Sequence, residues 1–353
     1  MNLTHEAKKQ LKVISSVFNQ QDWSEADKRE LIAKVKNVLK RDGTINYRAF
    51  EPNARWDFCS ERLKQGDYTN WDGWEFRSDW SKTFRWGVEV KCPLPKWDMQ
   101  PVKHLVILGE QGIGDEILFL SALPEIIVRY GRECIEFQTY PRLQSIVERS
   151  FGIRCTDRRM LSDVVEGDAV MALGELFPWF RRDKSHFPKK PFIKADPEKV
   201  EHWRKYLEQF GEKPKVGVAW ASTKGTIDPE LLKTIDGVYF DLQYRDPKVE
   251  IPYPVGQLEK PPFDVTSDLE NLFAFVKALD RAHSVTQTLC HVAGSQGVPV
   301  KAVLPQELKS HLWYYYNGSA LGKWESPIYP NFTVYRNIEE FRKHGKQQDV
   351  SGT

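Results

Sequence analysis

The chain has 353 residues, of which 41% are hydrophobic and 28% are charged, a composition typical of a soluble globular protein with room for two core domains. Its formal net charge of +2 excludes a global field that would drive binding to nucleic acid or membranes, although not a local basic patch. Scattered cysteines without a C-x-x-C pair, an N-terminus without an apolar signal-peptide core and the absence of a membrane-length apolar stretch together predict a cytoplasmic protein.

The first hundred residues divide into a polar helical part and an aromatic part. Apolar residues at helical spacing predict two amphipathic helices within 1–41 and a third from Ala54 to Leu63, which stops at Gly66. We assign 1–70 to a helical N-terminal extension. Residues 71–100 are dense in tryptophan, charge and turn residues, which indicates an irregular connector.

From residue 103 the pattern changes to alternating strands and helices. HLVILGE is an apolar run that predicts a buried strand, and DEILFLSALPEIIVRYG predicts a helix that ends at Gly131. CIEFQTY and GDAVMALGEL indicate two further strands, and PRLQSIVERSFG indicates a helix between them. This alternation is typical of a parallel sheet with helices on both faces. We therefore assign 101–205 to a Rossmann-like domain.

A second strand–helix series follows. DPEKVEHWRKYLEQFG predicts a long helix that starts at Asp196. Strands are then predicted at VGVAW, GVYFDLQY, HSVTQ and VPVKAVLP, and helices at DLENLFAFVKALDRA and TLCHVAGSQG. Two such series predict two similar α/β domains that face one another, the second over 206–335. NIEEFRKHGKQQ predicts a last helix within the tail 336–353.

The stretch GEQGIGDEILFL follows the first predicted strand of the first domain. Its glycines, Gly109, Gly112 and Gly114, have the spacing G-x-x-G-x-G, so they match neither the dinucleotide fingerprint nor a Walker loop. The turn places Asp115 at a helix N-terminus and at the carboxyl end of a strand, where ligands bind in open α/β sheets. The helix dipole favours an ionised carboxylate there. Asp115 is therefore either a catalytic base or simply the cap of its helix.

Two turns of the second domain have the character of anion sites. In KVGVAWASTKG, Ser222, Thr223 and Lys224 stand in a turn after a strand, where they could hold a diphosphate or form an ordinary solvated turn. The polar residues 286–288 stand between a strand and a helix start, a position that suits an anion. His291 follows one turn later and on its own would be interpreted as a satisfied buried histidine.

Together these stretches resemble a known family. GEQGIGDEILF, VGVAW, SVTQTLCHVAGSQGVPV and SPIYP occur in the order found in heptosyltransferase-type glycosyltransferases of the two-Rossmann-domain architecture called GT-B. The bacterial branch in which this module follows tetratricopeptide helices is the most similar, and WDGWEFRSDW is similar to its tryptophan-rich linker. The resemblance covers about residues 55–340. The first forty residues do not show the full tetratricopeptide pattern, so the N-terminal extension is interpreted as a helical remnant or cap.

The resemblance implies a hexosyl- or heptosyltransferase that moves a sugar from a nucleotide-sugar donor to an acceptor hydroxyl, with inversion and without a metal or other cofactor. The first domain would hold the acceptor and the second the donor. Asp115 matches the family's proposed general base, and helix N-termini with hydrogen-bond donors would neutralise the leaving diphosphate. The residues expected on the donor side are Gly112, Gly114, Trp220, Ser222, Thr223, Lys224, Gln243, Tyr244, Thr286, Gln287, Thr288 and His291.

One departure leaves alternatives open. The Asp of the family's SVDT motif is Thr286 here and the next Thr is Gln287, which implies either a different donor or decayed activity in a binding protein that retains the GT-B shape. The acceptor could also be a modified DNA base, because basic and aromatic residues gather between Trp71 and Trp97 and over 177–190; such strips are more often structural. The nucleotide, the sugar, the acceptor (glycan, protein or modified base) and the oligomeric state do not follow from the sequence.

Overall fold

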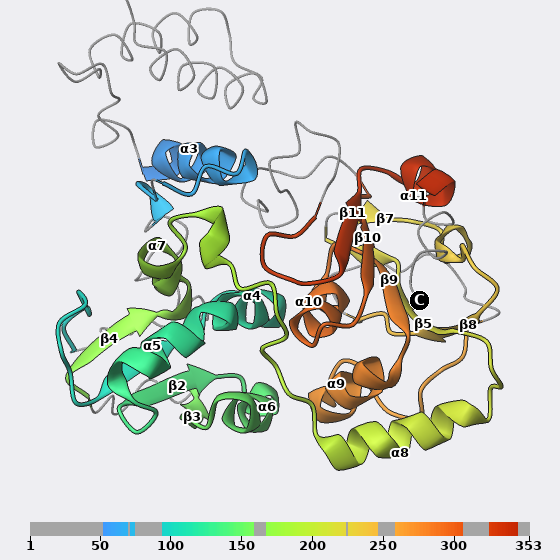
Figure 1. Ribbon diagram of the computed structural model, residues 1–353, viewed down its shortest axis with the longest axis horizontal. Coiled ribbons are helices and arrows are strands. Elements are labelled where there is room, and N and C mark those ends of the chain that lie inside the picture. The colour runs from blue at the N-terminus through green and yellow to red at the C-terminus, as the bar shows by residue number, and fades with distance from the viewer. Residues whose placement is uncertain are drawn as a thin grey trace, which may run out of the picture.

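The computed structural model describes residues 52–69, 71–74, 94–158, 167–223, 225–245, 258–305 and 325–344. The two helices predicted within 1–41, most of the connector and Lys224 lie outside these ranges. Figure 1 shows two α/β domains beside one another, with α3 (Pro52–Lys64) above the first. The observed span of α3 confirms the third predicted helix.

The first sheet has four parallel strands in the spatial order β3-β2-β1-β4. Its strands are β1 (Leu105–Leu108), β2 (Ile135–Thr139), β3 (Arg154–Asp157) and β4 (Ala169–Ala172). Every residue of β1, β2 and β4 is buried, as expected of a parallel sheet that is covered on both faces. The helices of this domain are α4 (Ile113–Phe119), α5 (Leu123–Tyr130), α6 (Pro141–Phe151) and α7 (Leu176–Phe180).

The single helix predicted after the glycine turn is in fact two helices. A 3-10 turn, Leu120–Ala122, separates α4 from α5. Pro124 explains the break, because it has no N–H to donate within a continuing helix and instead occupies the first turn of α5. The predicted end at Gly131 is confirmed, and its φ of 87° lies in the left-handed region that favours glycine.

The second sheet has five parallel strands in the order β11-β10-β9-β5-β8. Its strands are β5 (Lys215–Ala219), β8 (Val238–Asp241), β9 (Arg281–Val285), β10 (Val300–Val303) and β11 (Phe332–Tyr335). The helices are α8 (Pro197–Glu208), α9 (Leu269–Ala278), α10 (Thr288–Ser295) and α11 (Ile338–His344). A small antiparallel hairpin, β6 (Ala221–Ser222) and β7 (Gly225–Thr226), follows β5. The two parallel sheets confirm the predicted GT-B-like α/β fold class.

Two strands of the parallel sheets were not predicted, nor was the short hairpin of β6 and β7. β3 reads RCTD and is exposed or half-buried along its length, so it lacks the apolar run that identified its neighbours. β11 lies in the aromatic, proline-marked segment near the end of the chain and forms the edge of the second sheet. Both are edge strands with a single neighbour in their sheet, but only β3 has a polar sequence, since β11 reads FTVY and is mostly buried.

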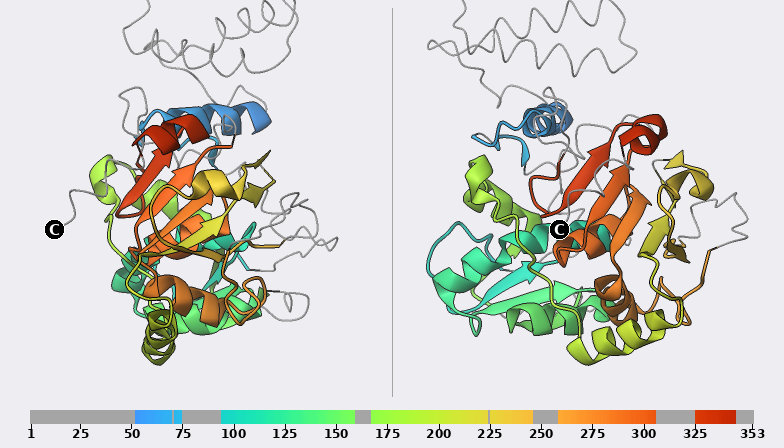
Figure 2. Two further views of the ribbon diagram at one scale, coloured as in Figure 1. Left: turned by 90° about the vertical axis from the view of Figure 1, so that its right-hand side faces the viewer. Right: turned by 45° about the vertical axis from the view of Figure 1, so that its right-hand side comes forward.

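Helix α8 packs on the second domain rather than on the first. Its N-cap, Asp196, accepts hydrogen bonds from the backbone N–H groups of Glu198 and Lys199. Its Trp203 indole donates to the Asn271 side chain of α9 at 3.2 Å. The views in Figure 2 show α8 running beneath α9. The domain boundary expected at residue 205 therefore falls inside a helix whose partner is α9.

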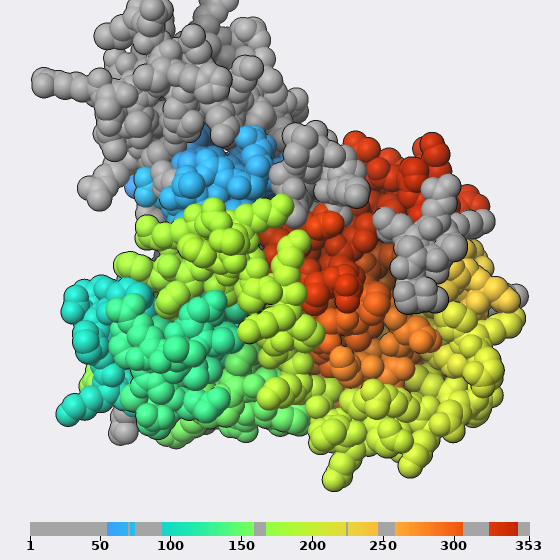
Figure 3. All heavy atoms as spheres, viewed as in Figure 1, coloured from blue at the N-terminus to red at the C-terminus, as the bar shows by residue number. Residues whose placement is uncertain are grey.

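Polar contacts tie the two domains together where α6 meets α9. The Arg149 guanidinium lies 2.7 Å from the Glu270 carboxylate, which also accepts from the Ser145 hydroxyl at 2.5 Å. Arg142 donates to the hydroxyl of Tyr244 at 3.0 Å and to the carbonyl of Thr266. On the face seen in Figure 3, the segment that connects the domains runs between them. Side chains of α6 thus fix the first domain against two segments of the second.

Candidate functional site

The strand order of each sheet marks where a ligand is expected. In the second sheet, β5 neighbours β8 on one side and β9 on the other, and in the first sheet β1 lies between β2 and β4. At such a switch point the strand order reverses, because the strands that follow are added on opposite sides of the central strand. Ligands bind beyond the carboxyl ends of the strands at this point. Residues 109–115 follow β1, residues 220–223 follow β5, and residues 286–288 follow β9. The sequence-predicted segments therefore lie at the switch points of their sheets.

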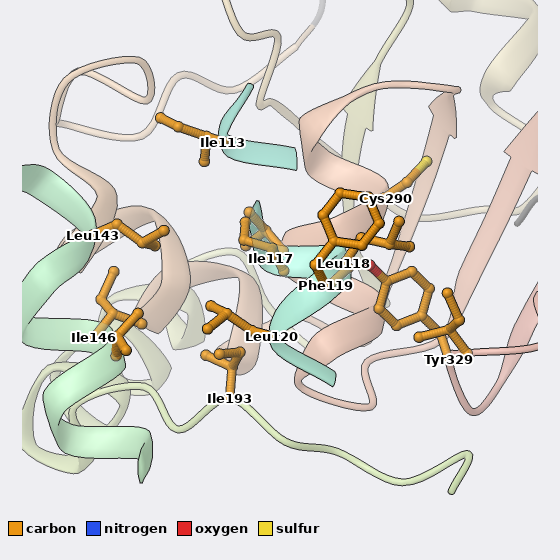
Figure 4. Close-up of a cluster of buried hydrophobic side chains, with 14 of the residues drawn as sticks. Ile113, Ile117, Leu118, Phe119, Leu120, Leu143, Ile146, Ile193, Cys290 and Tyr329 are labelled. Atoms are coloured by element: carbon orange, nitrogen blue, oxygen red, sulfur yellow. The ribbon is translucent and has the colours of Figure 1, made fainter. Parts of the chain in front are cut away.

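The glycine turn and the start of α10 meet across the domain junction. A Cβ built on Gly114 would lie 2.9 Å from Cδ2 of His291, a distance that real Cβ atoms do not adopt, so glycine is required for this contact. Helix α4 packs against α10. In Figure 4, Leu118 and Phe119 of α4 lie beside Cys290 of α10 and Tyr329. The structure thus brings the loop of Asp115 and the helix of His291 together.

The structure shows Asp115 in one of the two roles that the sequence left open, that of a cap of its helix. Its carboxylate accepts a hydrogen bond from the backbone N–H of Gly112 at 3.2 Å, so it does cap the first turn of α4. The side chain is half-buried and its negative charge reaches Tyr329, whose pKa it helps to raise. Asp115 therefore stands at the junction rather than on an outer surface, and capping fixes its orientation there.

His291 and Tyr329 form a buried pair on the second domain. Nδ1 of His291 lies 2.7 Å from the hydroxyl of Tyr329. Burial lowers the pKa of His291 to about 3, so the imidazole is neutral at physiological pH. Burial, with Cys290 and Asp115 adding to it, raises the pKa of Tyr329 well above its usual 10. Tyr329 was not predicted as a site residue, although SPIYP was among the motifs that supported the resemblance.

A second buried cluster holds the loop of Asp115 from the side of the first sheet. Gln111 has a φ of 59°, which is uncommon for a residue with a Cβ. Its carbonyl accepts from the Tyr140 hydroxyl at 3.2 Å and from the Arg158 guanidinium at 3.1 Å. Arg158 stacks on the Tyr140 ring, 3.6 Å from its centroid, and pairs with Glu116 at 2.5 Å. These donors hold Gln111 in its uncommon conformation.

Glu116 is the centre of this cluster, and its position explains why residue 109 is a glycine. Its carboxylate is fully buried and also accepts from the Thr139 hydroxyl. Burial raises the pKa of Glu116 to about 7, against the opposing effect of Arg158 and Thr139. A Cβ on Gly109 would lie 2.3 Å from Oε1 of Glu116, so the first glycine of the turn makes room for this carboxylate. The sequence could not indicate this contact, because residues 109, 139 and 158 meet only in the folded chain.

The turn before α10 presents donors that have no partner among the described residues. Thr286 is buried, and its hydroxyl has no hydrogen-bond partner within the described ranges. Gln287 is the N-cap of α10 but makes no side-chain cap, and its buried Nε2 also has no partner in that part of the chain. Thr288 is the first residue of the helix. Buried donors are costly to leave unpaired, so this turn has the character of an anion site.

The residues that follow β5 and β8 form hydrogen bonds with one another. The Gln243 side chain accepts from the backbone N–H groups of Trp220 and Ala221, at 2.8 and 2.9 Å, and donates to the carbonyls of Ala221 and Tyr244. Its amide therefore braces the turn rather than pointing outward. Trp220 is buried with its Nε1 unpaired among the described residues. The hydroxyl of Tyr244 is occupied by Arg142.

Ser222 and Thr223 lie in the hairpin after β5, where Ser222 is half-buried and Thr223 is exposed. Lys224, which the sequence places between them and β7, lies outside the described residues. Within the described ranges, no group of three or more His, Cys, Asp or Glu side chains is placed to hold a metal ion. No helix in those ranges has both the length and the apolar character needed to cross a bilayer.

Several residues of the basic and aromatic strips have structural positions. Trp71 and Trp74 are buried, and their indoles donate to the carbonyls of Arg181 and Gly174 at 3.0 and 2.9 Å. Trp97 is buried as well. Arg181 is fully buried, where it pairs with Glu125 and the Ser121 carbonyl. Trp71 and Trp74 attach the segment that follows α3 to the first domain. All four side chains are buried and so are not available to a nucleic acid.

A comparison with models of known protein families found no match. Among curated proteins, Protein FlbA of Caulobacter vibrioides is 28% identical over 264 residues, which are 65% of this chain and 44% of that protein. The chain thus spans less than half the length of this relative.

Similar solved structures include the glycosyl transferase family 9 from Veillonella parvula, with 14% identity, a TM-score of 0.44 and coverage of 72% of this chain and 93% of that one. The Escherichia coli ADP-heptose lps heptosyltransferase II has 13% identity, a TM-score of 0.40 and coverage of 70% and 98%. The dodecameric iron-containing heptosyltransferase TibC, in complex with ADP-D-beta-D-heptose, has 12% identity, a TM-score of 0.40 and coverage of 61% and 62%.

Proposed function

We propose that the chain is an inverting, metal-independent glycosyltransferase that moves a sugar from a nucleotide-sugar donor to an acceptor hydroxyl, with Asp115 as the general base. The observation that carries this proposal is the meeting of two switch-point loops across the domain junction. Asp115 comes from the first domain, and the imidazole of His291 from the second lies against the neighbouring Gly114. A base on one side and anion-holding groups on the other suit a displacement at a carbon between them.

The proposed reaction is a single displacement at the anomeric carbon of the donor sugar. The acceptor oxygen attacks the anomeric carbon and forms the new glycosidic bond, while the bond from that carbon to the donor phosphate breaks and its electron pair leaves with the diphosphate. The proton of the acceptor hydroxyl passes to the Asp115 carboxylate. Attack and departure on opposite sides of the carbon invert its configuration.

The charge that develops on the leaving diphosphate needs preorganised donors. The N-terminus of α10 supplies backbone N–H groups and the positive end of a helix dipole. The hydroxyl of Thr286 and the amide of Gln287, which have no partner among the residues that the structure describes, add two more donors. Thr286 in place of an acid therefore favours binding of a phosphate at this turn, so the departure from the family pattern is compatible with activity and is expected to alter which donor fits.

Asp115→Asn tests the proposal. The variant keeps the side-chain oxygen that caps α4 but cannot accept a proton, so transfer should fall by about 10²–10⁴-fold, while thermal stabilisation by nucleoside diphosphates should persist. Asp196→Asn is the control, because the Asp196 carboxylate also accepts backbone N–H groups at a helix start, as the N-cap of α8. Full-rate transfer by Asp115→Asn would exclude Asp115 as the base.

A binding protein without catalysis remains the second candidate, and the replacement of the family's acid by Thr286 is the observation that favours it. The two candidates differ in one measurement. A screen of nucleoside diphosphates by thermal shift identifies the nucleotide, and the matching nucleotide sugars are then tested for hydrolysis and transfer. Binding without turnover for every acceptor class would favour the binding protein.

A further inference from the structure

Tyr329 is held in place from several sides. It is 2% exposed, and its ring stacks on Phe192 at 6.1 Å and on Phe332 at 5.5 Å between centroids. Gly294 of α10 leaves space for the ring, since a Cβ there would lie 2.7 Å from Cγ of Tyr329. The phenol oxygen consequently has one position, 2.7 Å from Nδ1 of His291.

The chemistry of the pair decides where its protons lie. The pKa of His291 is about 3 and that of Tyr329 is raised above its usual value, so both groups are neutral at physiological pH. A neutral imidazole has one N–H donor and one acceptor nitrogen. The acceptor nitrogen is a stronger base than a phenol oxygen, whose lone pair is delocalised into its ring. The O–H of Tyr329 therefore donates to Nδ1, and the imidazole proton is on Nε2.

The orientation of His291 determines where the proton on Nε2 points. The ring edge that carries Cδ2 and Nε2 faces Gly114, with a Cβ built there at 2.9 and 3.4 Å from these two atoms. Asp115 is the next residue. A proton on Nε2 thus gives an N–H donor beside the proposed base, whereas a proton on Nδ1 would give an acceptor that repels phosphate oxygens.

We propose that Tyr329 is a positioning residue that keeps His291 in the Nε2–H tautomer, so that His291 donates a hydrogen bond to an oxygen of the leaving diphosphate. The second half of this statement rests on the function proposed above, and the first half does not. Tyr329 itself touches no reacting atom. Its role is to fix the proton of its neighbour.

The tautomer can be measured directly on the full chain. Long-range ¹H–¹⁵N spectra of protein labelled at histidine distinguish Nε2–H from Nδ1–H, and the loss of one signal set in His291→Gln assigns it. We expect the Nε2–H tautomer in the unmodified protein and a mixture of tautomers in Tyr329→Phe, which keeps the stacked ring. Tyr130→Phe, which removes a phenol bonded to the Met99 carbonyl, should leave the His291 signals unchanged. An Nδ1–H tautomer in the unmodified protein, or an unchanged spectrum in Tyr329→Phe, would overturn the proposal.

Kinetics then test the consequence for transfer. Tyr329→Phe should lower kcat/KM for the donor about tenfold, the effect of one hydrogen bond, without changing KM for the acceptor. A purely structural tyrosine would lose thermal stability without this selective effect on the donor. If the spectra agree with the prediction but the unmodified protein transfers no sugar, the glycosyltransferase proposal fails while the assignment of the proton stands.

Discussion

At the scale of single residues, the buried carboxylate of Glu116 has the clearest energetic consequence. Its pKa is about 7 in the folded protein against an ordinary 4.5, because burial outweighs the pairing with Arg158. A group whose pKa rises on folding binds its proton more tightly in the folded state. The stability that it contributes is complete below about pH 4.5 and is lost as the pH rises through about 7.

Glu116→Gln should therefore flatten the pH dependence of stability. The uncharged amide does not titrate, so the free energy of unfolding should lose a pH-dependent part on the order of a few kcal/mol between about pH 5 and pH 8. Urea unfolding at several pH values measures this slope. Glu201→Gln on the exposed face of α8 is the control and should keep the slope of the unmodified protein. An unchanged slope in Glu116→Gln would mean that Glu116 is ionised throughout.

The sequence identified those site residues whose position follows from neighbouring elements of the chain, such as a strand end or a helix start. Asp115 was predicted because it follows a strand and starts a helix, and the structure has it there. Tyr329 and Arg158 had no such local reason, because their partners are distant in the chain and the contacts form only on folding. Gln243 had a local reason, yet the structure turns its amide inward to brace Trp220.

At the scale of elements, the contact between α4 and α10 depends on Gly114. Gly114→Ala places a Cβ against the ring of His291, so we expect a loss of about 1–3 kcal/mol in stability and a clear loss of nucleotide binding. Gly112→Ala is the matched comparison, since its Cβ would have an ordinary 3.4 Å contact and should cost about 1 kcal/mol or less as a poorer cap. Chemical denaturation and nucleotide-induced thermal shift measure both effects. Equal losses in the two variants would contradict the role given to Gly114.

Periodicity predicted most elements of both sheets but not their order. The apolar runs of β1, β4 and β5 identified buried strands, whereas the polar edge strand β3 was not predicted because its residues are exposed or half-buried. The strand order follows from pairing between segments that are far apart in sequence. Periodicity therefore could not predict the switch points, although the carboxyl ends of the predicted strands already indicated where a ligand would bind.

The tryptophans that follow α3 allow a test of the alternative in which the aromatic strip binds nucleic acid. Trp74 is buried among Trp71 and Phe177, with its indole bonded to the Gly174 carbonyl. Trp74→Ala should lower stability by about 3–5 kcal/mol, which a thermal melt detects as a lower Tm. If the side chain instead served nucleic acid, the variant would keep its Tm and lose salt-dependent binding to DNA.

At the scale of the whole molecule, ionic contacts between α6 and α9 contribute to the relative position of the two domains. Arg149 and Glu270 are each about a quarter exposed, so solvent screens their attraction. A double-mutant cycle with Arg149→Ala and Glu270→Ala should give a coupling energy of about 1 kcal/mol or less, which weakens at high salt. A coupling of several kcal/mol would mean that this pair dominates the attachment of the domains.

The position of His291 also bears on where a donor phosphate would lie. The residue is 4% exposed and its ring edge lies against the glycine turn. On the proposed function, a donor phosphate bonded to Nε2 would therefore lie beside Gly114, one residue away from the proposed base. A substitution in this turn is then expected to change donor binding and transfer together.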